Sequence, residues 1–405
     1  MIKTPNRILK SALLLASVLL LAACGSNSSS TPAAATATVY YAHNFVFRNI
    51  TSGPFGVGYN AFGQLGTGTT ANSSIPFHIK HRMHFSGIAA GGDHSVAFFN
   101  NSTVFSWGYN VSGQLGDGKL ANRSVPVKTG INFSNVIAVA AGGLHSLALK
   151  SDDTLWAWGA NGFKQLGVHT VDAPGGHSKL PVRVGSSTAL FSNISSIAAG
   201  GTFSLARANG SVWSWGDNSK GQAGQRQPGL QPPLTFTTYS SPNRVDDFQA
   251  FGGVAGIAAG GASSYAVARD GSVWAWGNNE NGQLGNNLTT KSAKPVQVMK
   301  ADGNPLTNVI QVAAGIQHAL ARDINNNVWA WGYNAFGQLG NNTNLDSHVA
   351  VPVLISGVIT DIRAFGSSSM AFKDGHWYVW GDNTYGQLGT GSTGSILLPI
   401  RMPGF

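Results

Sequence analysis

The chain of 405 residues is rich in glycine and poor in charge, with 53 Gly and only 10% charged residues, where globular proteins average roughly 25%. A hydrophobic content of 42%, with 11 Trp and 20 Phe, excludes a disordered chain because this much apolar surface can offset the entropy of ordering. The net charge of +9 is spread without any Lys/Arg cluster of five or more, so no nucleic-acid partner is predicted. Glu280 is the only glutamate, and this scarcity of charged helix formers favours an all-β fold.

Residues 1–23 have the layout of a secretory signal. Three positive charges precede an apolar run at 11–21, which is too short to span ~30 Å of hydrocarbon as a helix. The following Leu-Ala-Ala-Cys ending at Cys24 resembles a bacterial lipoprotein box, which implies cleavage before Cys24 and a lipid on its sulfur. Ordinary cleavage that leaves Cys24 as a free thiol is the alternative. A flexible tether is expected over residues 24–38, followed by one domain over 39–405.

These features predict a protein outside the cytoplasm, held in the cell envelope by its lipid. Gly25 rather than Asp follows the cysteine, which favours the outer membrane if the host is Gram-negative. Because Cys24 is the only cysteine, the chain can form no intrachain disulfide and no cysteine-based metal site.

One motif, G-x-N-x-x-G-Q-L-G, dominates the rest of the chain. With small variations it starts at residues 58, 108, 159, 216, 277, 332 and 381, at intervals of 49 to 61 residues. Repeats of this length are typical of propeller blades or of a solenoid.

Each unit also contains two strand patterns joined by a tight turn. In Trp156-Ala157-Trp158 and its equivalents, the period of two places both indoles on one face and the small residue on the other. Such sheets can stack on copies of themselves, bulky face against small face. Asn209-Gly210, Asp270-Gly271 and Asp374-Gly375 favour the positive φ of tight hairpins. Pro-apolar stretches, such as those at Pro181 and Pro295, predict outer edge strands.

The two chain ends predict a closed ring. The chain stops at Phe405, just after a Pro-apolar stretch, and the segment 39–47 matches the His-containing strand of the other units. We therefore expect a closed seven-bladed β-propeller in which the N-terminal strand pairs with the C-terminal strands to complete the last blade. An open solenoid would instead require polar capping units at its ends.

The motifs A-A-G-G-x-H-S, x-V-W-A-W-G and G-x-N-x-x-G-Q-L-G resemble those of the regulator-of-chromosome-condensation repeat family, over about residues 39 to 405. The resemblance implies a seven-bladed propeller. Members of this family include a nuclear exchange factor for a small GTPase, a plant ultraviolet-B sensor and a secreted bacterial β-lactamase inhibitor, so the fold does not choose the function. A lipoprotein signal disfavours the exchange factor. The sensor's G-W-R-H-T motif is missing from the sequence, and the Trp residues occupy core-type strand positions.

One aligned column of the repeat is rich in histidine: His43, His94, His145, Phe203, Ser263, His318 and Ser368. Three imidazoles in consecutive blades could converge on a metal ion. The Phe and Ser at the same position favour a structural hydrogen-bonding role instead, and neither a metal nor a cofactor is predicted.

Catalytic and nucleotide-binding motifs are not found. Gly389 to Gly394 fits G-x-G-x-x-G, but no helical pattern follows it, as a dinucleotide site requires. Neither G-x-S-x-G nor H-E-x-x-H occurs. The chain is therefore predicted not to be an enzyme, with no catalytic residues. A hydrolase or lyase of envelope polymer, using Asp and His of the central channel, is the alternative from another class.

The candidate binding residues are the aromatics at the second and fifth motif positions: Tyr59, Phe62, Tyr109, Phe163, Tyr333, Phe336 and Tyr385. Because the motif occupies the same place in each blade, these side chains should lie on one face, where Tyr is favoured at interfaces. Alternatively, they pack between neighbouring blades. Insertions at 168–180 and 225–241 should protrude side by side from adjacent blades.

The sequence as a whole predicts a non-catalytic, membrane-anchored propeller that binds an as yet unidentified protein outside the cytoplasm. An inhibitor of a secreted or periplasmic enzyme, resembling the propeller-type β-lactamase inhibitor, is the second interpretation.

Overall fold

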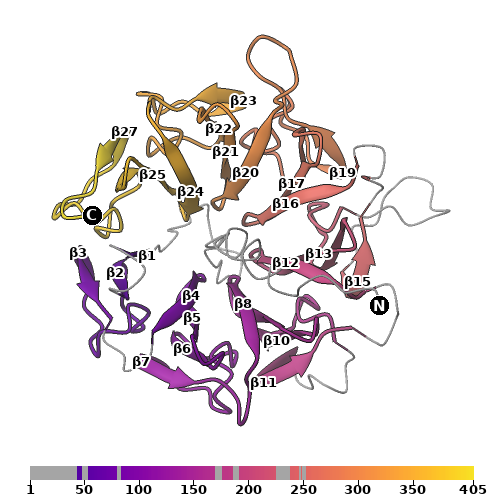
Figure 1. Cartoon of the computed structure of the whole chain (residues 1–405), viewed down its shortest axis with the longest axis vertical. Helices are drawn as coiled ribbons and strands as arrows, with labels where there is room; N and C mark the ends of the chain where they lie inside the picture. Colours follow the sequence, from indigo (N-terminus) through magenta and orange to yellow (C-terminus); the bar gives the residue numbers. More distant parts are fainter. Residues whose placement is uncertain are drawn as a thin grey trace, which may run out of the picture.

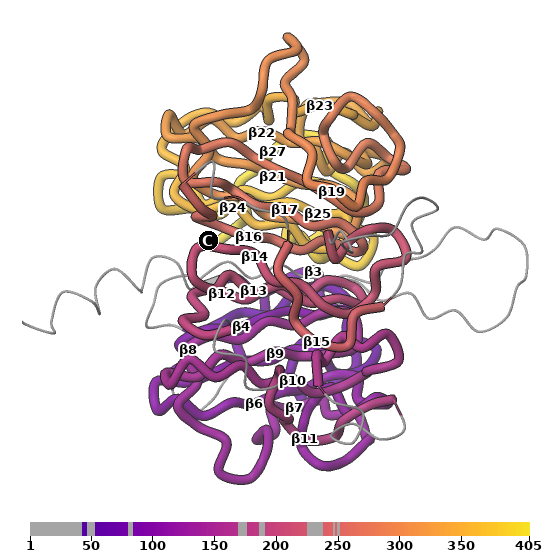
Figure 2. Tube along the Cα trace, turned by 90° about the vertical axis from the view of Figure 1, so that its right-hand side faces the viewer, coloured from indigo at the N-terminus to yellow at the C-terminus, as the bar shows by residue number. Residues whose placement is uncertain are grey.

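Seven antiparallel sheets surround a central axis in the computed structural model (Figure 1). The structure describes residues 43–47, 53–79, 84–168, 176–185, 191–224, 238–245, 248 and 252–405. Blade 1 is the three-stranded sheet β1–β3, and blades 2 to 7 are the four-stranded sheets β4–β7, β8–β11, β12–β15, β16–β19, β20–β23 and β24–β27. In the side view, the amino-terminal and carboxyl-terminal halves of the chain occupy opposite sides of the ring (Figure 2). The prediction of an all-β seven-bladed propeller is confirmed.

Each blade runs outward from the axis in chain order. The innermost strands are β4 (Phe85–Ala90), β8 (Val136–Ala141), β12 (Ile194–Ala199), β16 (Val254–Ala259), β20 (Val309–Ala314) and β24 (Ile359–Phe365). The second strands are β1 (His43–Phe47), β5 (His94–Phe99), β9 (His145–Lys150), β13 (Phe203–Ala208), β17 (Ser263–Ala268), β21 (His318–Asp323) and β25 (Ser368–Lys373).

The third strands are β2 (Pro54–Gly58), β6 (Val104–Gly108), β10 (Leu155–Ala160), β14 (Ser211–Gly216), β18 (Val273–Gly277), β22 (Val328–Gly332) and β26 (His376–Gly381), and all of them except β2 contain Trp. The outer strands are β3 (Ser73–His78), β7 (Arg123–Lys128), β11 (His177–Arg183), β15 (Tyr239–Arg244), β19 (Ser292–Gln297), β23 (Ser347–Pro352) and β27 (Ile396–Arg401). The Pro-apolar stretches fall in these outer strands, as predicted, because an edge position leaves the missing proline N–H without consequence for the sheet.

The hairpin turns have the backbone conformation that their residues favour. Asn209 and Asp374 adopt φ angles of 52° and 49°, and Gly210 and Gly375 follow them with φ of 73° and 83°. Two successive positive φ values match the right-handed twist of the strands that the turn connects.

Stacked indoles hold neighbouring blades together. Trp107, in β6 of blade 2, is fully buried, and its indole nitrogen donates a hydrogen bond to the carbonyl oxygen of Gln64 in blade 1 at 2.8 Å. The last glycine of the motif, Gly66, has φ +69°, and a Cβ there would lie 2.8 Å from the indole Nε1 of Trp107. Since no real Cβ approaches so closely, only glycine fits. The G-Q-L-G and W-x-W-G motifs are therefore the two sides of one contact between blades.

A second contact between blades uses the histidine column. The ring nitrogen Nε2 bonds the hydroxyl of a serine in the next blade in four pairs: His43–Ser95 at 2.9 Å, His94–Ser146 at 2.8 Å, His145–Ser204 at 2.9 Å and His318–Ser369 at 2.9 Å. The serine hydroxyl donates onward, as Ser146 does to the carbonyl oxygen of Gln114 at 2.9 Å. Since that hydroxyl has a single proton, the imidazole Nε2–H must be the donor in each pair.

The expected pairing of the chain ends is not found, and it requires a correction. Within the described residues, β1 pairs only with β2, whereas the last blade takes all four of its strands, β24 to β27, from the carboxyl-terminal end. Residues 39–42 lie outside the described residues. The segment resembles the His-containing strand because β1 is the second strand of its own blade.

Blades 7 and 1 are instead joined by a contact between the motif loop of one blade and the outer strand of the next, which also occurs between blades 1 and 2. A Cβ on Gly386 would lie 2.4 Å from the Cα of Ser74 in blade 1, as one on Gly63 would from Ser124 in blade 2. The backbone N–H of Gly391 donates to the carbonyl oxygen of Ser74 at 2.9 Å. Phe45, Val46, Met370 and Val379 belong to one buried cluster. Within the described residues, the ring is therefore closed by this contact between loop and outer strand and by shared apolar packing, without strand pairing. The indole and imidazole contacts are not repeated at this joint, because β2 has no Trp and Ser368 stands in the histidine column.

Candidate protein-binding face

The seven motif loops follow the third strand of each blade and are held rigidly by their own side chains. In blade 1, the side-chain oxygen of Asn60 accepts the backbone N–H of Leu65 at 2.8 Å, and its Nδ2 donates to the carbonyl oxygens of Thr69 and Ala71. The Oε1 of Gln64 accepts the N–H of Phe62 at 3.0 Å. Because Asn and Gln shape the loop, the second and fifth positions are free to vary and can carry function.

Four of the predicted aromatics form a continuous row across blades 7, 1 and 2. Ring centroids lie 5.0 Å apart between Tyr385 and Tyr59, 6.3 Å between Tyr59 and Phe62, and 4.6 Å between Phe62 and Tyr109. All four side chains are half-buried. We call these four residues the aromatic row. Two of its contacts cross between blades, so the rings pack against neighbouring blades and keep an exposed side as well.

The other three predicted aromatics lie apart from the row. Tyr333 and Phe336 pair with each other in blade 6, with centroids 6.2 Å apart. Phe163 in blade 3 is 47% exposed. Of the two predicted insertions, residues 169–175 and 225–237 lie outside the described residues, as do Cys24 and the signal and tether segments.

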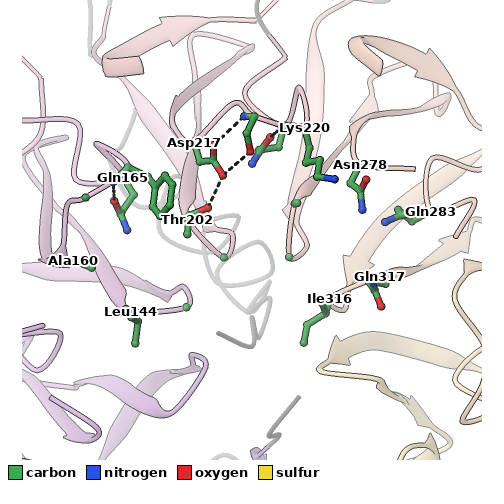
Figure 3. Close-up of a pocket in the computed structure, with 18 of the residues that line it drawn as sticks. Leu144, Ala160, Gln165, Thr202, Asp217, Lys220, Asn278, Gln283, Ile316 and Gln317 are labelled. Atoms are coloured by element: carbon green, nitrogen blue, oxygen red, sulfur yellow. Dashed lines mark hydrogen bonds between the residues drawn. The ribbon is translucent and has the colours of Figure 1, made fainter. Parts of the chain in front are cut away.

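A pocket that the sequence did not predict opens beside Phe163. It has a volume of about 750 Å³ and is lined by the motif loops of blades 3 to 5 and by the turns between the first and second strands of blades 3 to 6. Leu144 and Ile316 face it from opposite sides (Figure 3). We call it the central pocket. Its signal in the sequence is the replacement of Tyr and Phe at the variable motif positions by Asp217, Lys220 and Asn278.

The charged groups of the central pocket are largely paired. Lys220 Nζ lies 2.6 Å from Glu280 Oε1 across blades 4 and 5, and this hydrogen bond lowers the pKa of Glu280 below its usual value. Both side chains are well exposed, so the pair contributes little to stability. The Asp217 carboxylate accepts the hydroxyl of Thr202 at 3.1 Å and the backbone N–H of Ser219 at 2.9 Å.

The histidines of the column are not accessible to a substrate. His43, His94, His145 and His318 are fully buried, and burial lowers the pKa of each from 6.5 to about 3, so all four are neutral. Across the described ranges, no group of three or more His, Cys, Asp or Glu residues is placed to hold a metal ion. The same part of the chain contains no helix long and apolar enough to cross a membrane.

A ring of seven blades with rigid loops and a variable face defines a β-propeller of the repeat type. The chain belongs to the RCC1-like domain family, whose model matches residues 41–298 and 176–404. It is 32% identical over 262 residues to the mitochondrial RCC1 domain-containing protein RUG3 of Arabidopsis thaliana, covering 63% of this chain and 56% of RUG3. It is 29% identical over 325 residues to the ultraviolet-B receptor UVR8 of the same plant, covering 78% of this chain and 69% of UVR8.

Longer relatives and solved structures share the fold. The human E3 ubiquitin-protein ligase HERC2 is 30% identical over 275 residues, which are 66% of this chain and 5% of HERC2. The chain thus spans about half of RUG3 and a small part of HERC2. Human WBSCR16 superposes with a TM-score of 0.73 at 23% identity, over 86% of this chain and 93% of that one. Prp20p from Saccharomyces cerevisiae superposes with a TM-score of 0.70 at 22% identity, over 86% and 85%.

Proposed function

We propose that this protein is a non-catalytic, lipid-anchored propeller that binds a protein partner outside the cytoplasm through the aromatic row. The observation that carries the proposal is the row itself, with four adjoining Tyr and Phe rings on the variable loop positions. Aromatic side chains provide large contact area at a small loss of rotamer entropy, and they dominate the energetics of protein interfaces.

The rigidity of the loops supports this role. Phe62 is flanked by Asn60 and Gln64, whose side chains are bonded to the loop backbone. A binding surface whose backbone is already ordered loses less conformational entropy when a partner docks. Half-burial of the rings has the same effect, because each ring is held on one side by its neighbour while the other side stays open.

Related propellers are known as protein-binding molecules. Prp20p, which shares the fold, is described with its binding to Gsp1p and histones, and also in complex with Kap60. We propose an equivalent use of the ring here with a different partner, because the lipoprotein-like sequence at residues 21–24 supports a location of the domain on the outer side of a membrane.

The non-catalytic part of the proposal is supported by the histidine column. The rival interpretation, a hydrolase or lyase, requires His side chains in the channel that meet a substrate. His94 and His145 are completely buried, with Nε2 bonded to serine, and therefore cannot take a proton from a bound polymer.

The test is affinity capture from an envelope extract with the soluble fragment that starts at Ser26, followed by mass spectrometry. We expect the double variant Tyr59→Ala/Phe62→Ala to lose the retained partner. A Tyr333→Ala/Phe336→Ala variant, which changes the same motif positions in blade 6, should lose less. Ile131→Ala, which alters a side chain that is 89% exposed and lies outside the motif loops, should retain the partner fully. Equal retention by all three variants would refute the role of the row.

A further inference from the structure

We propose that the central pocket is a second binding site and that it takes a segment of polypeptide through its main-chain amides. The inference rests on the proposed function for the class of ligand, a polypeptide, but it concerns different blades and different side chains. It is carried by one side-chain amide donor, Gln222 Nε2, and one acceptor, Asn278 Oδ1, that line the pocket and have no hydrogen-bond partner among the described residues.

Three motif glutamines, Gln165, Gln222 and Gln283, line the pocket from blades 3, 4 and 5. In each, the loop fixes the side-chain oxygen: the Oε1 atoms accept the backbone N–H groups of Phe163 at 3.0 Å, Lys220 at 2.8 Å and Asn281 at 2.9 Å. With the oxygen held by the loop, the orientation of each Nε2 is set. The pocket therefore has a fixed array of amide donors.

One of these amides, that of Gln222, has no hydrogen-bond partner for its Nε2 among the described residues. Gln222 is 1% exposed. In blade 7 the equivalent Gln387 donates to Asp382 Oδ2 at 2.9 Å. Asp217 occupies the position of Asp382 in blade 4, but its carboxylate is bonded to Thr202 and Ser219 instead. The hydroxyl of Thr202 thus donates to Asp217 Oδ2, the carboxylate oxygen that is equivalent to the acceptor of Gln387 in blade 7, and Gln222 Nε2 has no bond to it.

An unpartnered acceptor lies on the same wall. Asn278, at the second motif position of blade 5, is 8% exposed and faces the pocket (Figure 3). Its Oδ1 has no hydrogen-bond partner in the part of the chain that the structure describes. Buried polar groups that remain unpaired destabilise the protein, so a ligand that pairs them gains affinity.

The chemistry of the wall selects the ligand. One unpartnered donor, Gln222 Nε2, and one unpartnered acceptor, Asn278 Oδ1, match a main chain, which offers C=O and N–H groups in alternation. Asp217 and Glu280 beside a single Lys220 disfavour a strongly anionic ligand. Leu144, Phe163 and Ile316 supply apolar contacts for small side chains, and a volume of about 750 Å³ lies within the ~300–1,000 Å³ typical of ligand sites.

The experiment is calorimetric titration of the soluble fragment with the capped peptide acetyl-Ala-Gly-Ala-Gly-Ala-amide, which carries no charged side chain. Gln222→Met removes the donor of the pocket. Its matched control is Gln114→Met, which loses the same loop bond, from the N–H of Ser112 at 3.0 Å, and whose Nε2 is equally unpartnered but outside the pocket. Asn278→Leu removes the acceptor.

We expect the peptide to bind the unmodified protein and Gln114→Met alike, and to bind Gln222→Met and Asn278→Leu about fivefold more weakly. Equal melting temperatures of the two methionine variants would show that the loss is not caused by unfolding. The proposal is overturned if the unmodified protein does not bind the peptide, or if all variants bind it equally. It is also overturned if only chitotriose, a glycan probe, binds and responds to Gln222→Met. Tyr59→Ala/Phe62→Ala should leave peptide binding unchanged, so failure of the row and failure of the pocket can be told apart.

Discussion

Blades 1 and 4 carry the same loop on the same scaffold and present opposite chemistry. In blade 1 the variable positions are Tyr59 and Phe62, which belong to the aromatic row, and in blade 4 they are Asp217 and Lys220, which line the central pocket. The Asn and Gln bonds that shape the loop are present in both blades. The repeat therefore fixes the backbone, while two positions per blade set the chemistry that the face presents, and we propose that these positions decide what it binds.

The largest loss of stability should come from substitutions that disrupt the packing between blades, which blades 1 and 4 share. Gly66→Ala under the row and Gly224→Ala beside the pocket each place a Cβ less than 3 Å from a buried indole nitrogen, at positive φ. We expect each substitution to lower the free energy of unfolding by about 2–4 kcal/mol in urea melts. Gly118→Ala, with φ +77° but nothing closer than 3.7 Å, should cost only about 1 kcal/mol. Equal losses at all three sites would contradict the close fit of the indole.

Replacement of the row by the blade 4 pattern should abolish binding without unfolding the protein. The variant Tyr59→Asp/Phe62→Lys copies Asp217 and Lys220 onto the loop of blade 1. Because aromatic hot spots contribute about 2 kcal/mol or more each, partner affinity should fall at least ~30-fold, measured by surface plasmon resonance with the captured partner. The reciprocal variant Asp217→Tyr/Lys220→Phe should leave that affinity unchanged. Loss of affinity in the reciprocal variant alone would assign the partner to the pocket.

Low pH should weaken the contacts between neighbouring blades, and it should weaken those that contain a buried histidine more than those that do not. Four buried histidines have a pKa of about 3 when folded and near 6.5 when unfolded, so their contribution is fully present above pH 6.5 and is lost as the pH falls toward 3. Each lowers the free energy of unfolding by roughly 1.4 kcal/mol per pH unit in that window. The joint from blade 4 to blade 5 has Phe203 in this column. Hydrogen exchange at pH 5 should therefore increase in β5 before it increases in β17.

The control for this prediction is His94→Phe, which copies Phe203. In urea melts at pH 7.5, 6 and 5, this variant should show a smaller dependence of the free energy of unfolding on pH. The difference should equal the contribution of one histidine. An unchanged slope would mean that His94 does not titrate between the folded and unfolded states.

The smallest effect should come from the exposed ion pair of the pocket. Lys220→Met removes a 2.6 Å contact to Glu280 between side chains that are 42% and 62% exposed. We expect a change in the free energy of unfolding below about 1 kcal/mol, and less still in 0.5 M salt. A larger loss in thermal melts would show that the joint between blades 4 and 5 depends on this pair.

Most of the scaffold could be predicted from the sequence because the same sequence patterns recur from one repeat to the next. The alternation in Trp156-Ala157-Trp158, the prolines of the outer strands and the histidine column all report local geometry, and each recurs in several of the seven repeats. The predicted pairing of the two chain ends was wrong. Residues 39–47 resemble the His-containing strand of the other repeats, and this resemblance identifies the type of strand but not the strand with which it pairs. A hairpin to β2 is the local alternative, and it is the pairing observed.

The binding face was only partly predictable. A shared motif position places Tyr59 and Tyr385 on one face, but only the ring geometry brings their centroids to 5.0 Å while Tyr333 and Phe336 remain separate. The central pocket depends on how loops from three blades converge around the axis, and no pattern within one repeat encodes that. The available signal was the change of residue type at Asp217 and Asn278.

The most direct test of the aromatic row is photo-crosslinking in living cells, with the full chain expressed in its native host. A photoreactive benzoylphenylalanine in place of Phe62 should give a discrete crosslink to one protein, because this ring belongs to the row. The same group in place of Ile131, which is 89% exposed and away from the motif loops, should give none. A crosslink from position 131 and none from position 62 would contradict the account.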